Sequence, residues 1–169
     1  LVTSLTFLPS NENVCVVGFS DGNINSFDLR MNVSENLDLN KIIAVGASDP
    51  ILKIMGNKNG SDFVFAATKS GKIIEWNANT NAFKISKPLV GQNQSLVDFS
   101  VHRNLPLLAL MPNDDSPFIC TPSGKILERV KNIPRDSAFD FHPILPLITF
   151  ATPNCEILSY DILLANDQK

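Results

Sequence analysis

The stretch Val14–Arg30 reads VCVVGFSDGNINSFDLR and predicts a β-hairpin. An apolar run ends at Phe19, the polar turn Ser20-Asp21-Gly22 follows, and a strand of alternating apolar and polar residues leaves the turn. Gly22 suits this turn because glycine adopts positive φ angles without a Cβ penalty. The second strand closes on an aromatic–acid pair, Phe27-Asp28. The rest of the chain repeats this unit of short strands around a tight turn.

The hairpin pattern recurs about every 40 to 50 residues, a spacing typical of four-stranded propeller blades. Placing Val2, Ile51, Leu96 and Ala138 in register yields four such units. The aromatic–acid pair returns as Trp76-Asn77 and Tyr160-Asp161, whereas the third unit has Ile119-Cys120 in that place. The predicted fold is all-β, a propeller with blades at about residues 1–46, 51–87, 95–130 and 137–165, followed by a tail at 166–169.

Four blades would make only part of a ring. Propellers typically close with about four to eight blades, often seven, and an open end leaves one sheet face without cover. We therefore expect a partial chain of a probable seven-bladed ring, with the remaining blades in the same full-length protein. The segment Ile162–Ala165 fits an outer strand, a helical turn or a linker equally well.

Composition narrows the class of protein. The 169 residues carry a formal net charge of −3, which gives no electrostatic footprint for nucleic acid or for an anionic membrane surface. No apolar run approaches about 18 residues, so we expect no membrane insertion and a cytoplasmic protein. Cys15, Cys120 and Cys155 form no CxxC motif and lie in or beside apolar strands, so we expect buried free thiols and no cofactor.

No residue cluster in the sequence predicts an active site. His102 and His142 occupy the same place in successive units, without acidic or cysteine residues at zinc-ligand spacing, and are expected to be structural turn residues. Asp98 and Asp140 alternate with apolar residues in first strands, where carboxylates could in principle perform acid–base chemistry in a channel. Asp114-Asp115 supplies too few oxygens for a calcium site and reads as a solvated turn.

The turns and blade connections are the expected partner-facing positions. They are short, polar and held on rigid sheets, a combination that suits docking of a protein or peptide. The candidate residues, taken from blade geometry, are Ser20, Asp21, Asp49, Lys69, Ser70, Asn93, Gln94, Asp114, Asp115, Arg135 and Asp136.

Two longer stretches carry a family resemblance. Val17–Met31 joins a tight turn, an alternating strand and an Asp-Leu-Arg-Met ending, and Phe139–Leu147 reads FDFHPILPL. Leu96–His102 and Thr121–Gly124 lie between them in the same order. On these residues the chain resembles WD40 propellers, and within them the C-terminal propeller of the raptor family, the scaffold subunits of TOR kinase complex one.

The resemblance implies a non-catalytic scaffold that binds the TOR kinase complex in nutrient-dependent growth signalling. The sequence departs from ordinary WD40 repeats where Gly46-Ala47 and Gly91-Gln92 replace the Gly-His pair, so the usual Asp-His-Ser-Trp hydrogen-bond network is not expected. No substrate-binding residue of that family maps onto this chain. Two alternatives stay open: a WD40 adaptor of another assembly, such as a ubiquitin ligase receptor or a trafficking coat, and an enzyme that uses Asp98 and Asp140.

Overall fold

The computed structural model describes residues 1–31, 41–44, 49–57 and 62–162. Within these ranges the chain forms strands, turns and connections, arranged in four separate antiparallel sheets. The same ranges hold no helix long and apolar enough to cross a membrane. The prediction of an all-β fold is confirmed.

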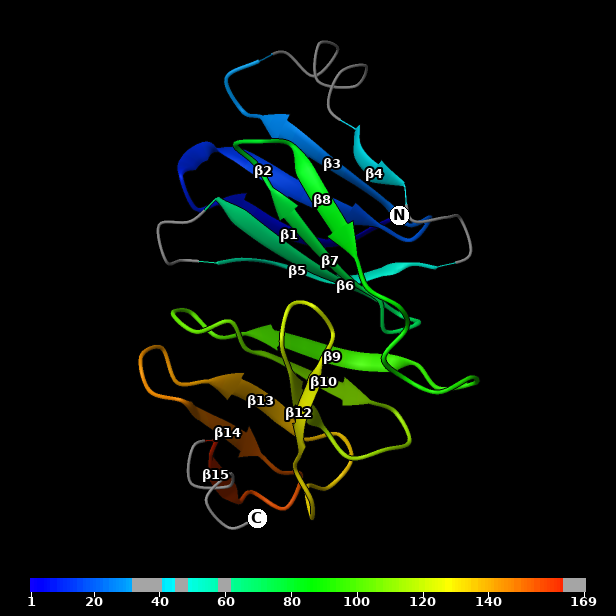
Figure 1. The fold of residues 1–169 in the computed structure, drawn as a ribbon, viewed down its shortest axis with the longest axis vertical. Coiled ribbons are helices and arrows are strands. Elements are labelled where there is room, and N and C mark those ends of the chain that lie inside the picture. The colour runs from blue at the N-terminus through cyan, green and yellow to red at the C-terminus, as the bar shows by residue number, and fades with distance from the viewer. Residues whose placement is uncertain (32–40, 45–48, 58–61, 163–169) are drawn as a thin grey trace.

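Strands follow one another in sequence order within each of the first two sheets (Figure 1). The first sheet contains β1 (Val2–Leu8), β2 (Asn11–Phe19), β3 (Asn23–Asp28) and β4 (Lys41–Ala44). The second sheet contains β5 (Ile51–Gly56), β6 (Phe63–Thr68), β7 (Ile73–Asn77) and β8 (Ala82–Ile85). Of the outer strand predicted for the first unit, residues 45 and 46 lie outside the described ranges.

The last two sheets repeat this order. The third contains β9 (Leu96–Val101), β10 (Leu108–Pro112), β11 (Phe118–Cys120) and β12 (Ile126–Arg129). The fourth contains β13 (Ala138–Phe141), β14 (Leu147–Ala151) and β15 (Ile157–Asp161). Ile162, which follows β15, is buried. The other residues of the segment for which the sequence allows a strand, a helical turn or a linker, 163–165, lie outside the described ranges.

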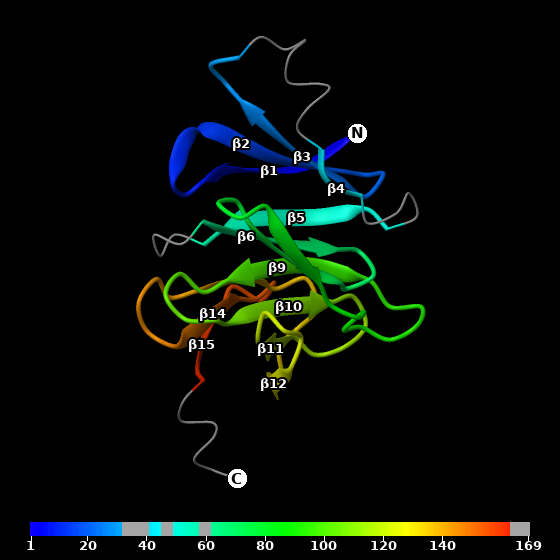
Figure 2. The same cartoon turned by 45° about the horizontal axis from the view of Figure 1, so that its top comes forward.

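The sheets stack in chain order, with the first at one end of the molecule and the fourth at the other (Figures 1 and 2). Contacts between sheets run through their first strands, from β1 to β5, β9 and β13. Each joint between neighbouring sheets buries its own apolar core. Representative core residues are Val16, Ile54 and Trp76 in the first joint, Phe65, Phe99 and Leu108 in the second, and Met111, Phe139 and Phe150 in the third. This is the arrangement of consecutive propeller blades.

Side chains also tie the first strands to one another. The Oγ of Ser4 in β1 accepts a hydrogen bond from the backbone amide of Ile54 at 2.9 Å. Lys53 Nζ in β5 lies 2.8 Å from Asp98 Oδ1 in β9. Each of the first two joints is therefore bridged by a polar contact as well as by apolar packing.

The register predicted for the fourth unit is wrong by two residues. His102 and His142 do take the same place, since each backbone amide bonds the leucine carbonyl five residues ahead. Counting back from them, Asp140 corresponds to Ser100, so Ala138 corresponds to Asp98 and not to Leu96. The alternation of apolar residues cannot reveal this error, because a shift of two residues keeps every side chain on its own face.

The apolar run Leu105–Leu110 predicts the second strand of the third unit, but this strand starts later. Leu105 and Leu107 belong to a turn, closed by a 2.8 Å bond between the amide of Leu107 and the carbonyl of Leu105, and β10 begins at Leu108. Pro112 ends that strand and is not part of the following turn. The ring Nδ1 of His102 accepts the amides of Asn104 and Leu105, which removes these amides from strand pairing.

The connection from β8 to β9 is held at its centre. The amide of Leu89 donates to the carbonyl of Gly71 at 3.0 Å, and Leu89 and Val90 pack against the core of the second joint. Gly71 has a φ of 80°, and a Cβ there would lie 2.9 Å from Val90 Cγ2. Gly124 in the β11–β12 turn faces Leu89 in a similar way, with a φ of 85°. Two glycine turns from neighbouring sheets thus enclose this connection.

Candidate interaction surface

The turns after each second strand and the connections between sheets meet at one end of the sheets. The amide of Lys69 donates to the carbonyl of Pro50, and the carbonyl of Lys69 accepts the amide of Leu96, both at 2.9 Å. The amide of Asn113 donates to the carbonyl of Ser95, and the side-chain Oδ1 of Asn113 accepts the amide of Ser95. We call this end the turn surface, formed by residues 20–22, 49–50, 69–71, 91–95, 113–116 and 134–137.

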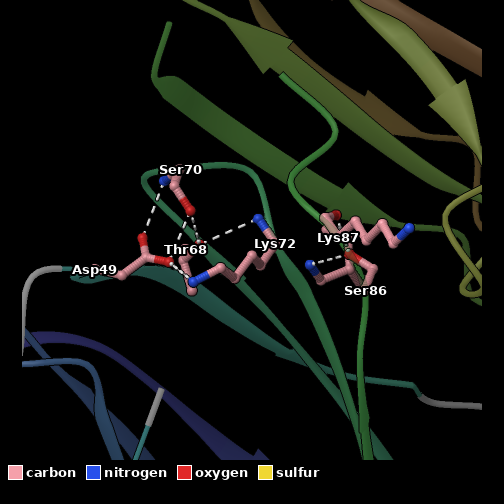
Figure 3. Close-up of polar contacts among 7 residues, drawn as sticks. Asp49, Thr68, Ser70, Lys72, Ser86 and Lys87 are labelled. Atoms are coloured by element: carbon pink, nitrogen blue, oxygen red, sulfur yellow. Dashed lines mark hydrogen bonds and ion pairs between the residues drawn. The ribbon is translucent and has the colours of Figure 1, made fainter. Parts of the chain in front are cut away.

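Asp49 is the buried centre of the turn surface on the second sheet (Figure 3). Its Oδ1 accepts the amide of Ser70 at 3.1 Å, and its Oδ2 accepts the Ser70 hydroxyl at 2.7 Å. Lys72 Nζ lies 2.9 Å from the same Oδ2. Thr68 completes the turn, since its hydroxyl oxygen accepts the amide of Lys72. This cluster holds the connection before β5 against the turn between β6 and β7.

Burial alone would raise the pKa of Asp49, but hydrogen bonds from Lys72 and Ser70 outweigh it and hold the pKa below its ordinary value. Asp49 is only 6% exposed, so the prediction that its side chain faces a partner is wrong. The Asp49 carboxylate is engaged by hydrogen bonds and an ion pair within the turn that it supports. Sequence reasoning also missed Lys72, although a lysine four residues after Thr68, next to Ser70-Gly71, was visible as a possible partner for a buried acid.

A groove opens on the turn surface between the third sheet and the connection that leads from it to the fourth. Its volume is about 280 Å³, and its apolar wall includes Val97, Met111 and Ile133. Val97 is half exposed although it lies inside β9. The sequence shows only a valine within an apolar strand, so it carries no signal for this exposure, and none of these three residues was predicted.

Four predicted residues surround this groove. Asp115, Arg135 and Asp136 line it, and Arg135 Nη1 lies 3.5 Å from Asp114 Oδ1. Arg129 Nη1 lies 2.6 Å from Asp115 Oδ2. Such exposed ion pairs contribute about 0–1 kcal/mol each, so a partner can replace them at little cost. The structure thus places a cluster of exchangeable charges beside apolar surface.

The other predicted positions lie elsewhere on the turn surface. Lys69 and Asn93 are exposed, and Gln94 uses its Oε1 to accept the amide of Gly91. Asp21 accepts the amide of Asn23, which lowers the pKa of this exposed carboxyl. The Ser20 hydroxyl accepts a hydrogen bond from the amino group of Leu1. Together with Ser70 beside Asp49, these residues are spread over the first three sheets and form no single pocket.

Asp98 and Asp140 hold neighbouring sheets together. Asp98 is paired with Lys53, as described above, and Asp140 Oδ1 accepts the Ser100 hydroxyl at 2.6 Å. Each carboxylate also accepts the amide of the next residue, Phe99 or Phe141. They are not at equivalent positions, and Asp98 lines the groove whereas Asp140 does not. The geometry therefore provides both with a structural role.

The two histidines cap turns, as predicted. Nδ1 of His142 accepts the amides of Ile144 and Leu145, which matches the bonds made by His102. Since Nδ1 of His102 is an acceptor, its Nε2 carries the proton and donates to the carbonyl of Leu145 at 2.8 Å. The described residues contain no group of three potential metal ligands among His, Cys, Asp and Glu.

The cysteines divide into two kinds. Cys15 and Cys120 are buried free thiols, as predicted, and burial raises the pKa of Cys120 to about 12. Cys155 is exposed, so the prediction of burial is wrong for this residue. It lies in the turn between β14 and β15 with a φ of 63°, a turn position and not a strand position.

The chain is similar to several solved propellers. A crystal structure of raptor from Chaetomium thermophilum has a TM-score of 0.73 and 23% identity, over 94% of this chain and 15% of that one. The Cps50 (Swd1) β-propeller domain of Myceliophteria thermophila has a TM-score of 0.71 and 13% identity, over 94% and 53% of the two chains. The WD40 domain of Toxoplasma gondii coronin has a TM-score of 0.71 and 14% identity, over 96% and 44%.

These similarities show the fold, a WD40-type β-propeller architecture. The chain spans about half the length or less of the propeller chains named above, and about a seventh of raptor. The sequence matches no family model and no curated protein.

Proposed function

We propose that this WD40-type propeller chain is a non-catalytic scaffold, a raptor-like subunit of the TOR kinase complex that acts in the cytoplasm in nutrient-dependent growth signalling. The sequence resemblance at Val17–Met31 and Phe139–Leu147 supports this assignment. The 23% identity to raptor, against 13% and 14% to the other two propellers, points the same way. WD40-type propellers typically serve as interaction modules, and the polar residues that could suggest catalysis are used to join sheets and cap turns.

The observation that carries the interaction role is the groove between the third sheet and the connection to the fourth. It combines apolar wall residues with replaceable charge pairs on a rigid support, the usual composition of a protein-binding site. Val97 and Met111 in the wall of the groove belong to β9 and β10, which are paired strands with little freedom to rearrange. A partner would thus meet a preformed surface, which lowers the entropic cost of binding.

Further blades belong on both end faces in this proposal. Ile54, Phe99 and Phe139 hold equivalent places in β5, β9 and β13, and each is at most 8% exposed. Leu5 holds that place in β1 and is 52% exposed. At the other end Ile157 is 76% exposed, although its counterparts Ile24 and Ile73 are buried. The two end faces are built from the same strand positions as the inner joints, so we expect a further sheet of the same kind to pack on each of them.

The assignment can be tested by tagging the protein in its own cells and quantifying the co-purified proteins. We expect the TOR kinase among them, and we expect its recovery to fall when Asp114 and Asp115 are both changed to lysine. An Asp28→Lys variant is the control, since Asp28 lies at the opposite end of the sheets. Recovery of a ubiquitin ligase core or a vesicle coat without the kinase would support the adaptor alternative. Retention of every partner by the double variant would contradict the role of the groove.

A further inference from the structure

A second, more apolar cleft lies at the end of the sheets opposite the turn surface. It has a volume of about 280 Å³ and sits between the second and third sheets. Phe65 and Leu108, both buried, form its floor, and Phe63, Leu107 and Pro122 contribute to its walls. The rings of Phe63 and Phe65 stack with centroids 6.5 Å apart. The floor belongs to the core of the second joint, so the cleft has a rigid base.

One carboxylate interrupts this apolar lining. Glu75 in β7 pairs across the sheet with Phe65 and faces the cleft. The equivalent place in the third sheet belongs to Ile119, which is 1% exposed and packs in the third joint. Ser26 and Ser159 hold the corresponding places in the first and fourth sheets, so a polar residue is common here, and Glu75 differs from these serines by its charge beside apolar walls.

The residues described around Glu75 leave its carboxylate available. Lys84 is its partner in the β7–β8 ladder, but within the described ranges no ion pair or hydrogen bond engages the Glu75 side chain. A carboxylate beside apolar walls has a strong preference for a cationic partner, because the reduced dielectric strengthens the attraction between opposite charges.

We propose that this cleft binds a peptide segment of a protein partner in which an apolar side chain stands next to lysine or arginine. The apolar side chain would fill the space over Phe65 and Leu108, and the cation would pair with Glu75. Small-molecule sites usually measure about 300–1,000 Å³, so this volume suits one or two side chains better than a whole cofactor. The proposal rests on the interaction role proposed above and adds a second docking surface with its own chemistry.

Selection of a random hexapeptide phage library on the purified full-length protein tests the proposal. We expect enrichment of peptides with an apolar residue adjacent to lysine or arginine. In fluorescence polarisation, the enriched peptides should bind Glu75→Gln about tenfold more weakly and Glu75→Lys more weakly still, because a favourable charge pair is first lost and then reversed. Phe63→Ala should also weaken binding, since it removes part of the apolar wall.

Two variants control for charge and for location. Glu12→Lys makes the same charge change at an exposed site on the first sheet, and Asp115→Lys alters the groove on the turn surface. Neither should change peptide affinity. Circular dichroism should show that Glu75→Gln keeps the fold.

Any of four results would overturn the proposal: no enrichment, enriched peptides without a basic residue, equal binding by Glu75→Lys, or binding lost in Asp115→Lys. These results would not decide whether the groove binds the TOR kinase complex, because that assay depends on Asp114 and Asp115 and does not change Glu75.

Discussion

The inner joints and the end faces are built from the same strand positions, yet they differ in what covers them. Phe99 is completely buried where the third sheet meets the second, whereas Leu5, at the equivalent place in the first sheet, is half exposed. His102 reaches a carbonyl on the next sheet, and His142 caps its turn with the same two bonds. The comparison teaches that the contribution of a strand position to stability depends on whether a neighbouring sheet covers it.

The largest expected effect tests this directly. Phe99→Ala should lower the free energy of unfolding by about 3–5 kcal/mol, because it removes a buried ring and leaves a cavity. In the 169-residue chain, where the face of the first sheet is uncovered, Leu5→Ala at the equivalent place should cost less than about 1 kcal/mol, as exposed substitutions usually do. Denaturant unfolding of both variants measures the difference. Equal losses would show that Leu5 is covered in solution and would break the comparison.

The histidines should show a smaller contrast. His102→Ala removes three hydrogen bonds inside a buried site, so we expect a loss of about 2–3 kcal/mol in unfolding free energy. His142→Ala removes two bonds at a half-exposed turn, where water can replace the ring, and should cost about 1 kcal/mol or less. Hydrogen exchange should also show faster exchange of the amides of Asn104 and Leu105 in His102→Ala alone, because these amides donate to the His102 ring. Similar losses for both variants would argue against a specific bond between the third and fourth sheets.

Asp49 should make stability depend on pH in the acid range. Its pKa in the folded chain lies below the ordinary value of 3.8, so its contribution is complete above that value and is lost as the pH falls through the folded pKa. Asp49→Asn should therefore cost about 1–2 kcal/mol at pH 7, and the gap to the parent chain should narrow below about pH 4.

Asp28→Asn is the matched control for this experiment. Hydrogen bonds from the Arg30 side chain hold the pKa of Asp28 at about 2, but the Arg30 side chain is 63% exposed and such surface pairs contribute little to stability, so we expect only a small change in stability at neutral pH. A gap between Asp49→Asn and the parent chain that stays constant down to pH 2 would contradict the assigned role of the Asp49 carboxylate.

The smallest effect concerns the pair between the second and third sheets. Lys53 and Asp98 have side chains that are 37% and 34% exposed, and such pairs contribute about 0–1 kcal/mol. A double-mutant cycle with Lys53→Met and Asp98→Asn should yield a coupling in this range that fades in 1 M salt. A larger coupling that resists salt would place this pair among the buried contacts of the joint.

The repeat itself could be predicted because its signals are local. Turn residues such as Gly22 and Gly71 take the positive φ angles that their turns require. Asn77 replaces a closing aspartate, and its Oδ1 accepts the amides of Asn79 and Thr80, much as Asp28 accepts the amide of Arg30. Turn chemistry and strand alternation act over a few residues, so a single sequence contains them.

The interaction surface could be predicted only in outline, because it depends on contacts between distant segments. Asp49 appears polar in a connection, but it is buried once Ser70 and Lys72 lie opposite. The groove needs Val97 and Ile133, which come together only when the connection after β12 lies beside β9. Residue type says little about such positions until the pairing of the sheets is known.

The connection from the second to the third sheet has a practical consequence. Its part at Leu89 and Val90 is enclosed by glycine turns, while Gly91, Gln92 and Asn93 beyond it are exposed. Extra residues inserted after Gly91 would extend into solvent, whereas insertion before Leu89 would wedge the sheets apart. A fluorescent dye or an affinity handle grafted after Gly91 would therefore report on the molecule without loosening its architecture.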